Sequence, residues 1–359
     1  MTPRIAAAVA FAAAFASASE LGDLVEGLHW KRAQALVEAR LPASGGASAK
    51  ADFLWRASQV RLAHGDLEGA AKFAEQAAEL DPGNSTYQVQ LFEVYGSQAE
   101  KASLLRQASL GRKCKKALDR ALELNRNDLD GLYGAMLFYY QAPGFFGGDK
   151  TKARAIPAAM AAIDPVRGIL AEARLAQMEG RLDRLEGIYL RAVEAGPADY
   201  HARMELANFY LSGTPNRKLH LAENHAREAS RLRPGRAAPY AILASAAALA
   251  GRFADAQRHV AAAVEAVPDN LAPQLAGASA LITTGADLAS AEKWCRAYLA
   301  QRPQPDAPPH AIARWRLAQA LAKLGRRAEA AREIAEARRL LPKHDGIRAD
   351  YERLKSARG

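Results

Sequence analysis

Small residues recur at helical spacing in the stretch Ala70-Ala71-Lys72-Phe73-Ala74-Glu75-Gln76-Ala77-Ala78-Glu79-Leu80-Asp81-Pro82, which closes in Leu-x-Pro. Variants of the same phrase return further along the chain and end at Pro234, Pro268 and Pro342. Alanines three or four positions apart share one face of an α-helix, and such small side chains let a second helix approach closely. Because proline cannot continue a helix, each phrase predicts the end of a closely packed helix.

The phrase recurs at nearly regular intervals. Weaker copies end at Arg126, Pro165, Pro197 and Pro303. Successive endings therefore lie 32 to 44 residues apart. Between them, where a first helix would stop, the chain has Gly65, Gly180, Gly251 and Gly325. Glycine accepts the positive φ that often ends a helix. Since no stretch alternates polar and apolar residues, we expect paired helices and no sheet.

This unit resembles the tetratricopeptide repeat (TPR), a helix pair of about 34 residues. Its small residue at position 8 of the repeat is Ser58, Ala173, Ala207, Ala244, Ser279 or Ala318 in successive better copies. The resemblance covers about residues 50–342 and implies about eight TPR-like repeats. The implied fold class is all-α: a TPR-like α-solenoid, a right-handed superhelix of antiparallel helix pairs whose first helices line a concave face.

Composition agrees with a helical chain of this kind. Alanine and leucine dominate the apolar half of the sequence, and both have high helix propensity. The 49 Lys and Arg residues exceed the 39 Asp and Glu residues, for a net charge of +10. Only Arg112-Lys113-Cys114-Lys115-Lys116 and the last fifty residues are locally dense in cations. Such charge can attract acidic partners, nucleic acid or anionic lipid, or can simply keep an Arg-rich surface solvated.

The first eighteen residues have the features of a secretory signal peptide. Arg4 supplies a positive start, residues 5–15 are an unbroken apolar run, and Ala16-Ser17-Ala18 has the small residues of a cleavage site. We therefore expect residues 1–18 to be removed and the protein to be exported, periplasmic or secreted, and soluble. No later apolar stretch has the length of a membrane-spanning helix.

The two ends of the repeat region are expected to be covered. Residues 19–49 predict an N-terminal helix near residues 21–41, followed by a flexible linker at 42–46. Residues 343–359 predict a polar C-terminal capping helix. A helical stack needs such caps because its terminal apolar faces would otherwise meet water.

Two repeats depart from the common length. One holds about ten extra residues around 100–111, and the next holds the loop Gln141-Ala142-Pro143-Gly144-Phe145-Phe146-Gly147-Gly148-Asp149. Two adjacent phenylalanines are unusual in a solvated turn, so Phe145 and Phe146 are candidate contacts for a partner. Residues 147–150 could hold an anion at a helix start, but Asp149 acting as an N-cap explains them better. Pro157 is expected to kink or shorten the next helix.

The sequence offers no sign of catalysis. It lacks the nucleophile-elbow, phosphate-loop and His-Glu-x-x-His motifs. His220, Glu223 and His225 cannot converge on one metal from a regular helix, because positions i and i+5 do not share a face. Cys114 and Cys295 fall in predicted packing helices, which favours buried free thiols over a disulfide. We therefore predict no enzyme, no metal and no cofactor.

The TPR resemblance also implies which residues face the groove. Carried over by repeat position, they are Trp55, Gln59, Tyr133, Tyr140, Arg174, His201, Asn208, Trp315, Gln319 and Lys323. Tyrosine, tryptophan and arginine are enriched at protein interfaces, although the aromatic residues could equally pack between repeats. The carboxylate clamp of chaperone-binding relatives is not expected, because its positions carry Leu170, Met204 and Ala241.

These observations favour a non-enzymatic scaffold that binds a peptide or protein in the periplasm or cell envelope. The alternative is an accessory subunit of a solute-uptake system, which would bind a periplasmic component or a small ligand. Binding of nucleic acid is allowed by the charge, but the signal peptide argues against it.

Overall fold

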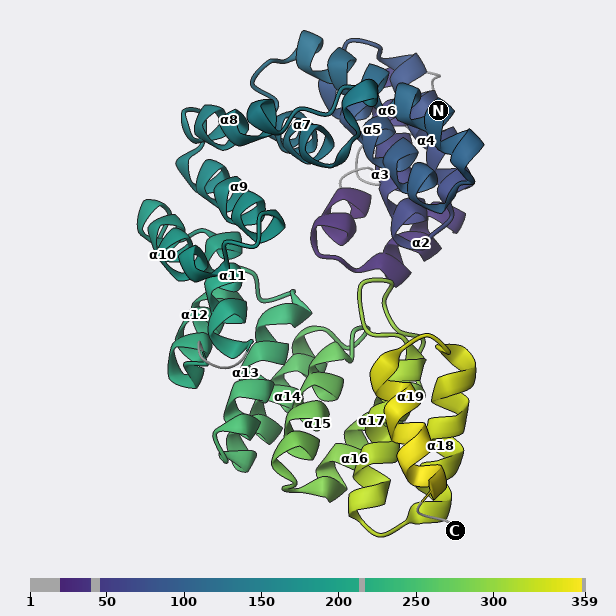
Figure 1. Cartoon of the computed structure of the whole chain (residues 1–359), viewed down its shortest axis with the longest axis vertical. Coiled ribbons are helices and arrows are strands. Elements are labelled where there is room, and N and C mark those ends of the chain that lie inside the picture. Colours follow the sequence, from purple (N-terminus) through teal and green to yellow (C-terminus); the bar gives the residue numbers. More distant parts are fainter. Residues whose placement is uncertain (1–19, 40–45, 213–216, 357–359) are drawn as a thin grey trace, which may run out of the picture. The chain divides into compact units, whose positions relative to one another are not determined.

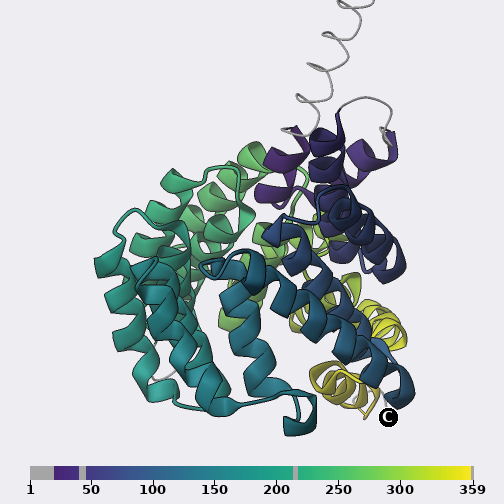
Figure 2. The same ribbon diagram turned by 90° about the horizontal axis from the view of Figure 1, so that it is seen from above.

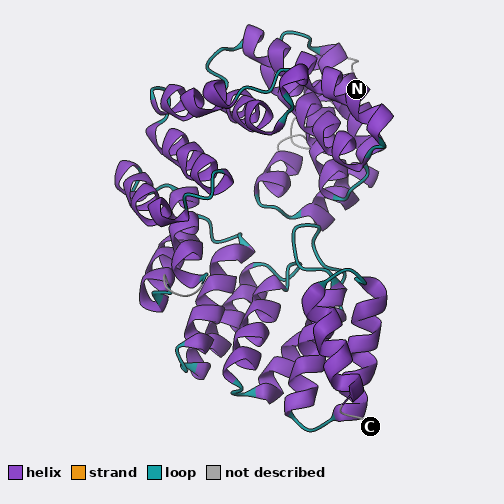
Figure 3. Cartoon of the chain, in the orientation of Figure 1, coloured by secondary structure: helices purple, strands orange, loops and turns teal. Residues whose placement is uncertain are grey.

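The computed structural model describes residues 20–39, 46–212 and 217–356, and all regular structure in these ranges is helical (Figure 3). The predicted all-α fold class is therefore confirmed. The proposed signal peptide, and most of the predicted linker, lie outside the described residues. None of the described helices combines the length and the apolar character that crossing a bilayer requires.

The chain divides into two compact units, residues 1–196 and 197–359. After a helical stretch at residues 20–26, the first unit contains α2 (Trp30–Ala39), α3 (Ala47–Ala63), α4 (Leu67–Leu80), α5 (Ser85–Lys101), α6 (Leu104–Leu124), α7 (Leu129–Gln141), the 3₁₀ turn η1 (Gly144–Phe146), α8 (Lys150–Ala161), α9 (Pro165–Met178), η2 (Leu182–Arg184) and α10 (Leu185–Ala195).

The second unit has the same kind of elements. It contains α11 (Tyr200–Leu211), α12 (Leu219–Leu232), α13 (Ala237–Leu249), α14 (Phe253–Ala266), α15 (Ala272–Thr284), α16 (Leu288–Leu299), α17 (His310–Lys323), α18 (Arg327–Leu340) and α19 (Asp345–Ser356).

Consecutive helices pack side by side as pairs in both units (Figures 1 and 2). The pairs are α3/α4, α5/α6, α7/α8 and α9/α10 in the first unit, and α11/α12, α13/α14, α15/α16 and α17/α18 in the second. Most first helices also contact the first helix of the next pair, as α3 does with α5 and α13 with α15. Each unit is thus a TPR-like stack of helix pairs.

Alanines form the contacts between helices, as the repeated phrase predicts. In α4, the buried side chains are Ala70, Ala71, Ala74 and Ala77. Because each is only a methyl group, the two helix backbones can approach closely enough to exclude water. Ala207, Ala244 and Ala318 are fully buried as expected, but in α15 the buried residue is Ala278 and Ser279 is half-buried. The register of that helix therefore differs by one residue from the prediction.

The turn glycines are confirmed. Gly65, Gly180, Gly251 and Gly325 all have positive φ, between 72° and 79°. In each of these turns the chain leaves the first helix of a pair and starts back along the second. A residue with a Cβ would be strained there.

The N-terminal segment differs from the single helix that the sequence predicts. The helix at residues 20–26 is followed by a turn in which Leu28 has a φ of 58°, and α2 follows. The amide of His29 donates to the carbonyl of Leu24 and that of Leu28 donates to Val25. This is a Schellman ending with leucine in the place usually taken by glycine. It lets Leu21, Val25 and α2 cover one face of α3.

The first length departure lengthens a helix, whereas the second forms the loop around η1. The extra residues lengthen α6 to 21 residues, whereas the second helices α4, α12, α14 and α18 have 14. Pro157 does not end its helix: it lies buried inside α8, which continues to Ala161. At the other end of the chain, α19 packs on α18 and buries Ile347.

Candidate functional site

Three predicted groove residues of the first unit pack between helices. Trp55 is half-buried, and its ring centroid lies 6.0 Å from that of Tyr87 on α5, the first helix of the next pair. The Arg56 guanidinium lies 4.0 Å from the centroid of the Trp55 ring. Tyr133 packs against the apolar cluster of α6 to α9. The Oε1 atom of Gln59 is buried and accepts no hydrogen bond from the described residues. Trp55 and Tyr133 thus stabilise the stack.

The remaining predicted residues differ in exposure. The hydroxyl of Tyr140 donates to the carbonyl of Met178 at 3.0 Å, so this side chain ties α7 to the end of α9. Arg174, His201 and Asn208 are exposed. Their exposure leaves these side chains at the surface.

Trp315 and Gln319 in the second unit are held by the C-terminal helix. The indole Nε1 of Trp315 donates to Asp350 at 2.7 Å, and Gln319 Nε2 donates to the same carboxylate oxygen at 2.6 Å. Arg353 adds an ion pair to Asp350 at 2.6 Å. Asp350 is itself buried, so α19 covers the face that the repeat position assigns to the groove.

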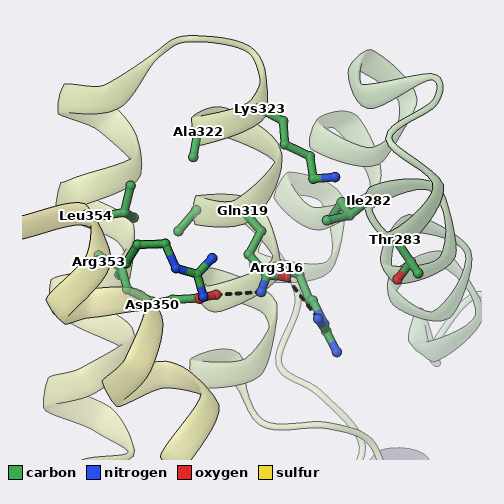
Figure 4. Close-up of a pocket in the computed structure, with 11 residues that line it drawn as sticks. Ile282, Thr283, Arg316, Gln319, Ala322, Lys323, Asp350, Arg353 and Leu354 are labelled. Carbon is green, nitrogen blue, oxygen red and sulfur yellow. Dashed lines mark hydrogen bonds and ion pairs between the residues drawn. The ribbon is translucent and has the colours of Figure 1, made fainter. Parts of the chain in front are cut away.

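A cavity of about 320 Å³ lies beside this cluster (Figure 4). Its walls come from α15, α17, α18 and α19, and Figure 4 shows side chains of α15, α17 and α19 converging on it. Arg316, Lys323 and Arg353 supply positive charge around it, and Ile282 and Leu354 supply apolar surface. The cavity has the size and mixed lining of a small-ligand site.

A larger groove, about 950 Å³, lies in the first unit against α6. Its lining joins α5 and α6 to the η1 loop of the next repeat. The lining residues are Gln88, Leu91, Tyr95, Gly111, Arg112, Lys113, Lys115, Lys116, Ala117, Asp119, Arg120, Glu123, Phe145 and Phe146. The cationic run and the two phenylalanines, which lie about thirty residues apart in the sequence, therefore border one surface. We call it the α6 groove.

The floor of the α6 groove is apolar and its wall is cationic. Leu91, Tyr95 and Ala117 are buried members of one apolar cluster. Burial raises the pKa of Tyr95, and its hydroxyl donates to Glu75 at 2.8 Å, so the ring is fixed as a neutral phenol. The Lys113 ammonium lies 5.0 Å from the centre of that ring.

Three cations of the wall have no carboxylate partner among the described residues. Lys115 is neutralised by Asp119 at 2.6 Å, and Arg120 by Glu123 at 3.3 Å. Arg112, Lys113 and Lys116 are exposed and make no such ion pair. An unpaired row of cations on one helix repels itself, so an anionic ligand would relieve that repulsion.

Backbone hydrogen bonds hold the η1 loop in place against α6. The amides of Phe146 and Gly148 donate to the carbonyl of Pro143, and that of Asp149 donates to Tyr139 at 2.8 Å. Gly147 has a φ of 94°, and a Cβ there would lie 3.4 Å from Cε of Lys115. The loop therefore lies directly against α6.

The exposed ring of the loop is its most unusual feature. Phe145 remains 84% exposed while its ring centroid lies 4.5 Å from that of Phe146. The Asp149 carboxylate accepts the amides of Thr151 and Lys152, as expected of an N-cap. Because this carboxylate occupies the start of α8, a second anion would be repelled there.

Other titratable side chains, Glu223 and His225 among them, are engaged by arginines. Glu223 is buried and pairs with Arg252, while His225 Nδ1 accepts from Arg203 at 3.2 Å. In the described residues no group of three His, Cys, Asp or Glu side chains could hold a metal ion. Both cysteines are free and buried, as expected, and burial raises the pKa of each thiol to about 12.

Sequence reasoning missed several residues of these surfaces. Asp350 was not singled out, although a lone acid on the inner face of a capping helix beside Trp315 is a detectable signal. Leu91 and Tyr95 resemble ordinary core positions, and nothing in the sequence placed them beside Phe145. Only the structure joins the cationic run to the loop.

Solved structures of other proteins resemble the chain at low identity. They include the APC/C hetero-tetramer Cut9–Hcn1 (13% identity, TM-score 0.47, covering 95% of this chain and 77% of that chain). Yeast Tom70 has 14% identity and a TM-score of 0.47, with 96% and 88% covered. A tetratricopeptide repeat protein from Parabacteroides merdae has 13% identity and a TM-score of 0.44, with 85% and 99% covered.

At this identity and TM-score, these similarities do not indicate a function or a partner for the chain. No protein-family model matches the chain, and no curated protein matches it. The TPR-like architecture is therefore defined by the helices of this chain and by how they pack.

Proposed function

We propose that this chain is a non-enzymatic scaffold that is exported to the periplasm or cell envelope and binds a protein or peptide there. The observation that carries the proposal is the α6 groove, in which an apolar floor, cations without carboxylate partners in the described ranges and the exposed Phe145 occur together. Exposed apolar surface framed by polar groups is typical of interaction sites.

The distribution of polar groups supports a binding role over a catalytic one. Catalysis needs a nucleophile, acid or base held beside its activating partner. In the described residues, buried charged groups such as Glu223 and Asp350 are instead engaged by Arg252, Arg353 and Trp315. The Glu223–Arg252 and Trp315–Asp350 contacts join different elements, and the Asp350–Arg353 pair lies within α19.

Photocrosslinking from the η1 loop tests the binding role. Phe145 is replaced by benzoylphenylalanine in the producing cells, and Leu182, exposed in a different loop, carries it in the control. A discrete crosslinked protein is expected from position 145 and not from 182. In addition, F145A/F146A should weaken recovery of that partner while the helical circular dichroism stays unchanged. Unchanged recovery would overturn the assignment of this surface.

Export is tested separately. Fractionation should place the protein in the periplasm or medium, and its mature N-terminus should begin near Ser19, after Ala16-Ser17-Ala18. A chain that keeps Met1 and remains in the cytoplasm would overturn this part of the proposal.

The cavity in the second unit favours one alternative, an accessory subunit of a solute-uptake system that holds a small ligand. Arg316, Lys323 and Arg353 around about 320 Å³ suit a small carboxylate-bearing molecule. Native mass spectrometry of protein purified from its own host would show an added small mass. R353A should lose that mass, and wild-type protein without any added mass would remove the alternative.

A further inference from the structure

We propose that the α6 groove binds an extended acidic peptide segment that carries an aromatic or large apolar side chain. The inference rests on the proposed function, in that it names the chemistry of the protein partner. It is argued from charge, spacing and apolar surface in turn.

Charge selects an anionic ligand. Arg112, Lys113 and Lys116 are exposed and lack carboxylate partners in the described part of the chain, whereas most surface arginines of the second unit are paired. What sets them apart is that all three lie within five residues on one face-lining helix of the α6 groove. A bound carboxylate would gain a charge-assisted hydrogen bond with any of the three.

Spacing selects an extended peptide. Arg112, Lys116 and Arg120 stand four residues apart on α6, so they form a row with steps of about 6 Å. In an extended chain, side chains on the same face repeat every second residue, or about 6.6 Å. A segment with acidic residues at alternate positions therefore matches the three cations of the row over its two steps.

Apolar surface selects a peptide over a purely electrostatic ligand. The buried cluster of Leu91, Tyr95 and Ala117 forms the floor, and the exposed Phe145 ring borders it. A phenylalanine or leucine of the ligand would bury its side chain against these groups. Burial of a whole side chain of this kind contributes as much to binding as several exposed ion pairs.

The same wall disfavours a nucleic acid. Asp119 and Glu123 lie on the C-terminal half of the groove, among the cations. A continuous phosphate backbone along the wall would pass close to these two carboxylates, whereas a peptide can place a neutral or basic residue opposite them. The observations therefore favour a peptide.

Fluorescence anisotropy of the full chain tests the proposal. The probe is a fluorescein-labelled nine-residue peptide with glutamate at odd positions, phenylalanine at positions 4 and 6, and serine at the other even positions. Control probes replace every glutamate by lysine, replace both phenylalanines by serine, or consist of a nine-nucleotide oligouridylate. The wild-type protein should bind the first probe best, and the affinity should fall as salt rises.

Charge reversal on α6 supplies the decisive variant. R112E/K113E/K116E should raise the Kd of the glutamate probe about tenfold or more, since each exposed ion pair contributes about 0.2–1 kcal/mol. The matched control K72E/K293E/K343E makes the same change in net charge at exposed lysines outside the groove, and should change the Kd less than about twofold. The helical circular dichroism of both variants is compared with wild type.

The loop variant tests the apolar half of the argument. Wild-type protein should prefer the phenylalanine probe to its serine version, and F145A/F146A should lose that preference while retaining the response to salt. Loss of this preference would show that the phenylalanines of the probe and those of the η1 loop contribute to binding together.

Several results would overturn the inference. They are equal Kd values for wild type and the α6 triple variant, equal binding of the lysine probe, or tighter binding of the oligouridylate. If no peptide binds but position 145 still crosslinks a protein in cells, the proposed function stands and the acidic-segment inference fails. If the peptide binds as expected and no partner crosslinks in cells, the acidic-segment inference stands and the proposed function fails.

Discussion

Replacing Gly168 by alanine tests how tightly the helix pairs are packed. Gly168 is buried in α9, and a Cβ added there would lie less than 3.0 Å from the backbone nitrogen and Cα of Ala161 at the end of α8. Glycine to alanine inside a helix normally stabilises it by about 0.5–1 kcal/mol. Here the obstacle is backbone, which cannot rotate away, so the two helices must separate at an overpacking cost of about 1–3 kcal/mol. The expected net effect of G168A is a destabilisation of about 1–2 kcal/mol.

Gly111 provides the matched control, because it lies inside α6 and a Cβ there would meet nothing within 4 Å. G111A should therefore stabilise the chain by about 0.5–1 kcal/mol. Both variants are compared with wild type by urea unfolding, and hydrogen exchange locates the change in α8 and α9. Stabilisation of similar size in both variants would show that α8 and α9 do not approach as described.

Three further predictions concern individual side chains. D350A should lower stability by about 1–3 kcal/mol, because it leaves the Nε1–H of Trp315 without its acceptor; urea unfolding monitored by tryptophan fluorescence measures this, and an unchanged midpoint would count against the role of α19. Partial burial alone would raise the pKa of Glu292, but hydrogen bonds from arginines, among them Arg326, outweigh it and hold that pKa below 4.5. These hydrogen bonds therefore stabilise the folded chain above pH 4.5, and that stabilisation is lost as the pH falls through the lowered pKa of Glu292. E292Q should therefore flatten the decrease of stability at acid pH. Cys114, with its pKa raised to about 12, should resist iodoacetamide at pH 8 in the native protein and react in urea; rapid native labelling would contradict its burial.

The stack of helix pairs was predictable because its determinants are local. Ala70, Ala74 and Ala77 mark a close helix contact by spacing alone, and Gly65 marks the turn by its φ requirement. Each repeat contacts chiefly its neighbours, so a pattern read within 34 residues suffices to describe the architecture.

Local reading failed where a distant residue decides the outcome. Ser279 fits the small-residue position in sequence, yet Ala278 takes the buried place in α15. Trp315 matches a groove position, but whether it meets a ligand or α19 depends on Asp350, thirty-five residues later. No periodicity within one repeat contains that information.

The α6 groove shows the same limit. The cationic run at 112–116 and the phenylalanine loop were each unusual in the sequence, but nothing local relates them. Their proximity follows from the way α7 returns the chain, so that the η1 loop contacts α6 at Lys115. The only available signal in the sequence was that two neighbouring repeats are both unusual.

Hydrogen exchange of the full chain with and without the phenylalanine-containing glutamate peptide tests the central claim most directly. Bound peptide should slow exchange in residues 111–123 of α6 and in 143–149 around η1, and leave α15 to α19 unchanged. Protection confined to α15–α19, or a peptide that binds without slowing exchange in α6, would contradict the account.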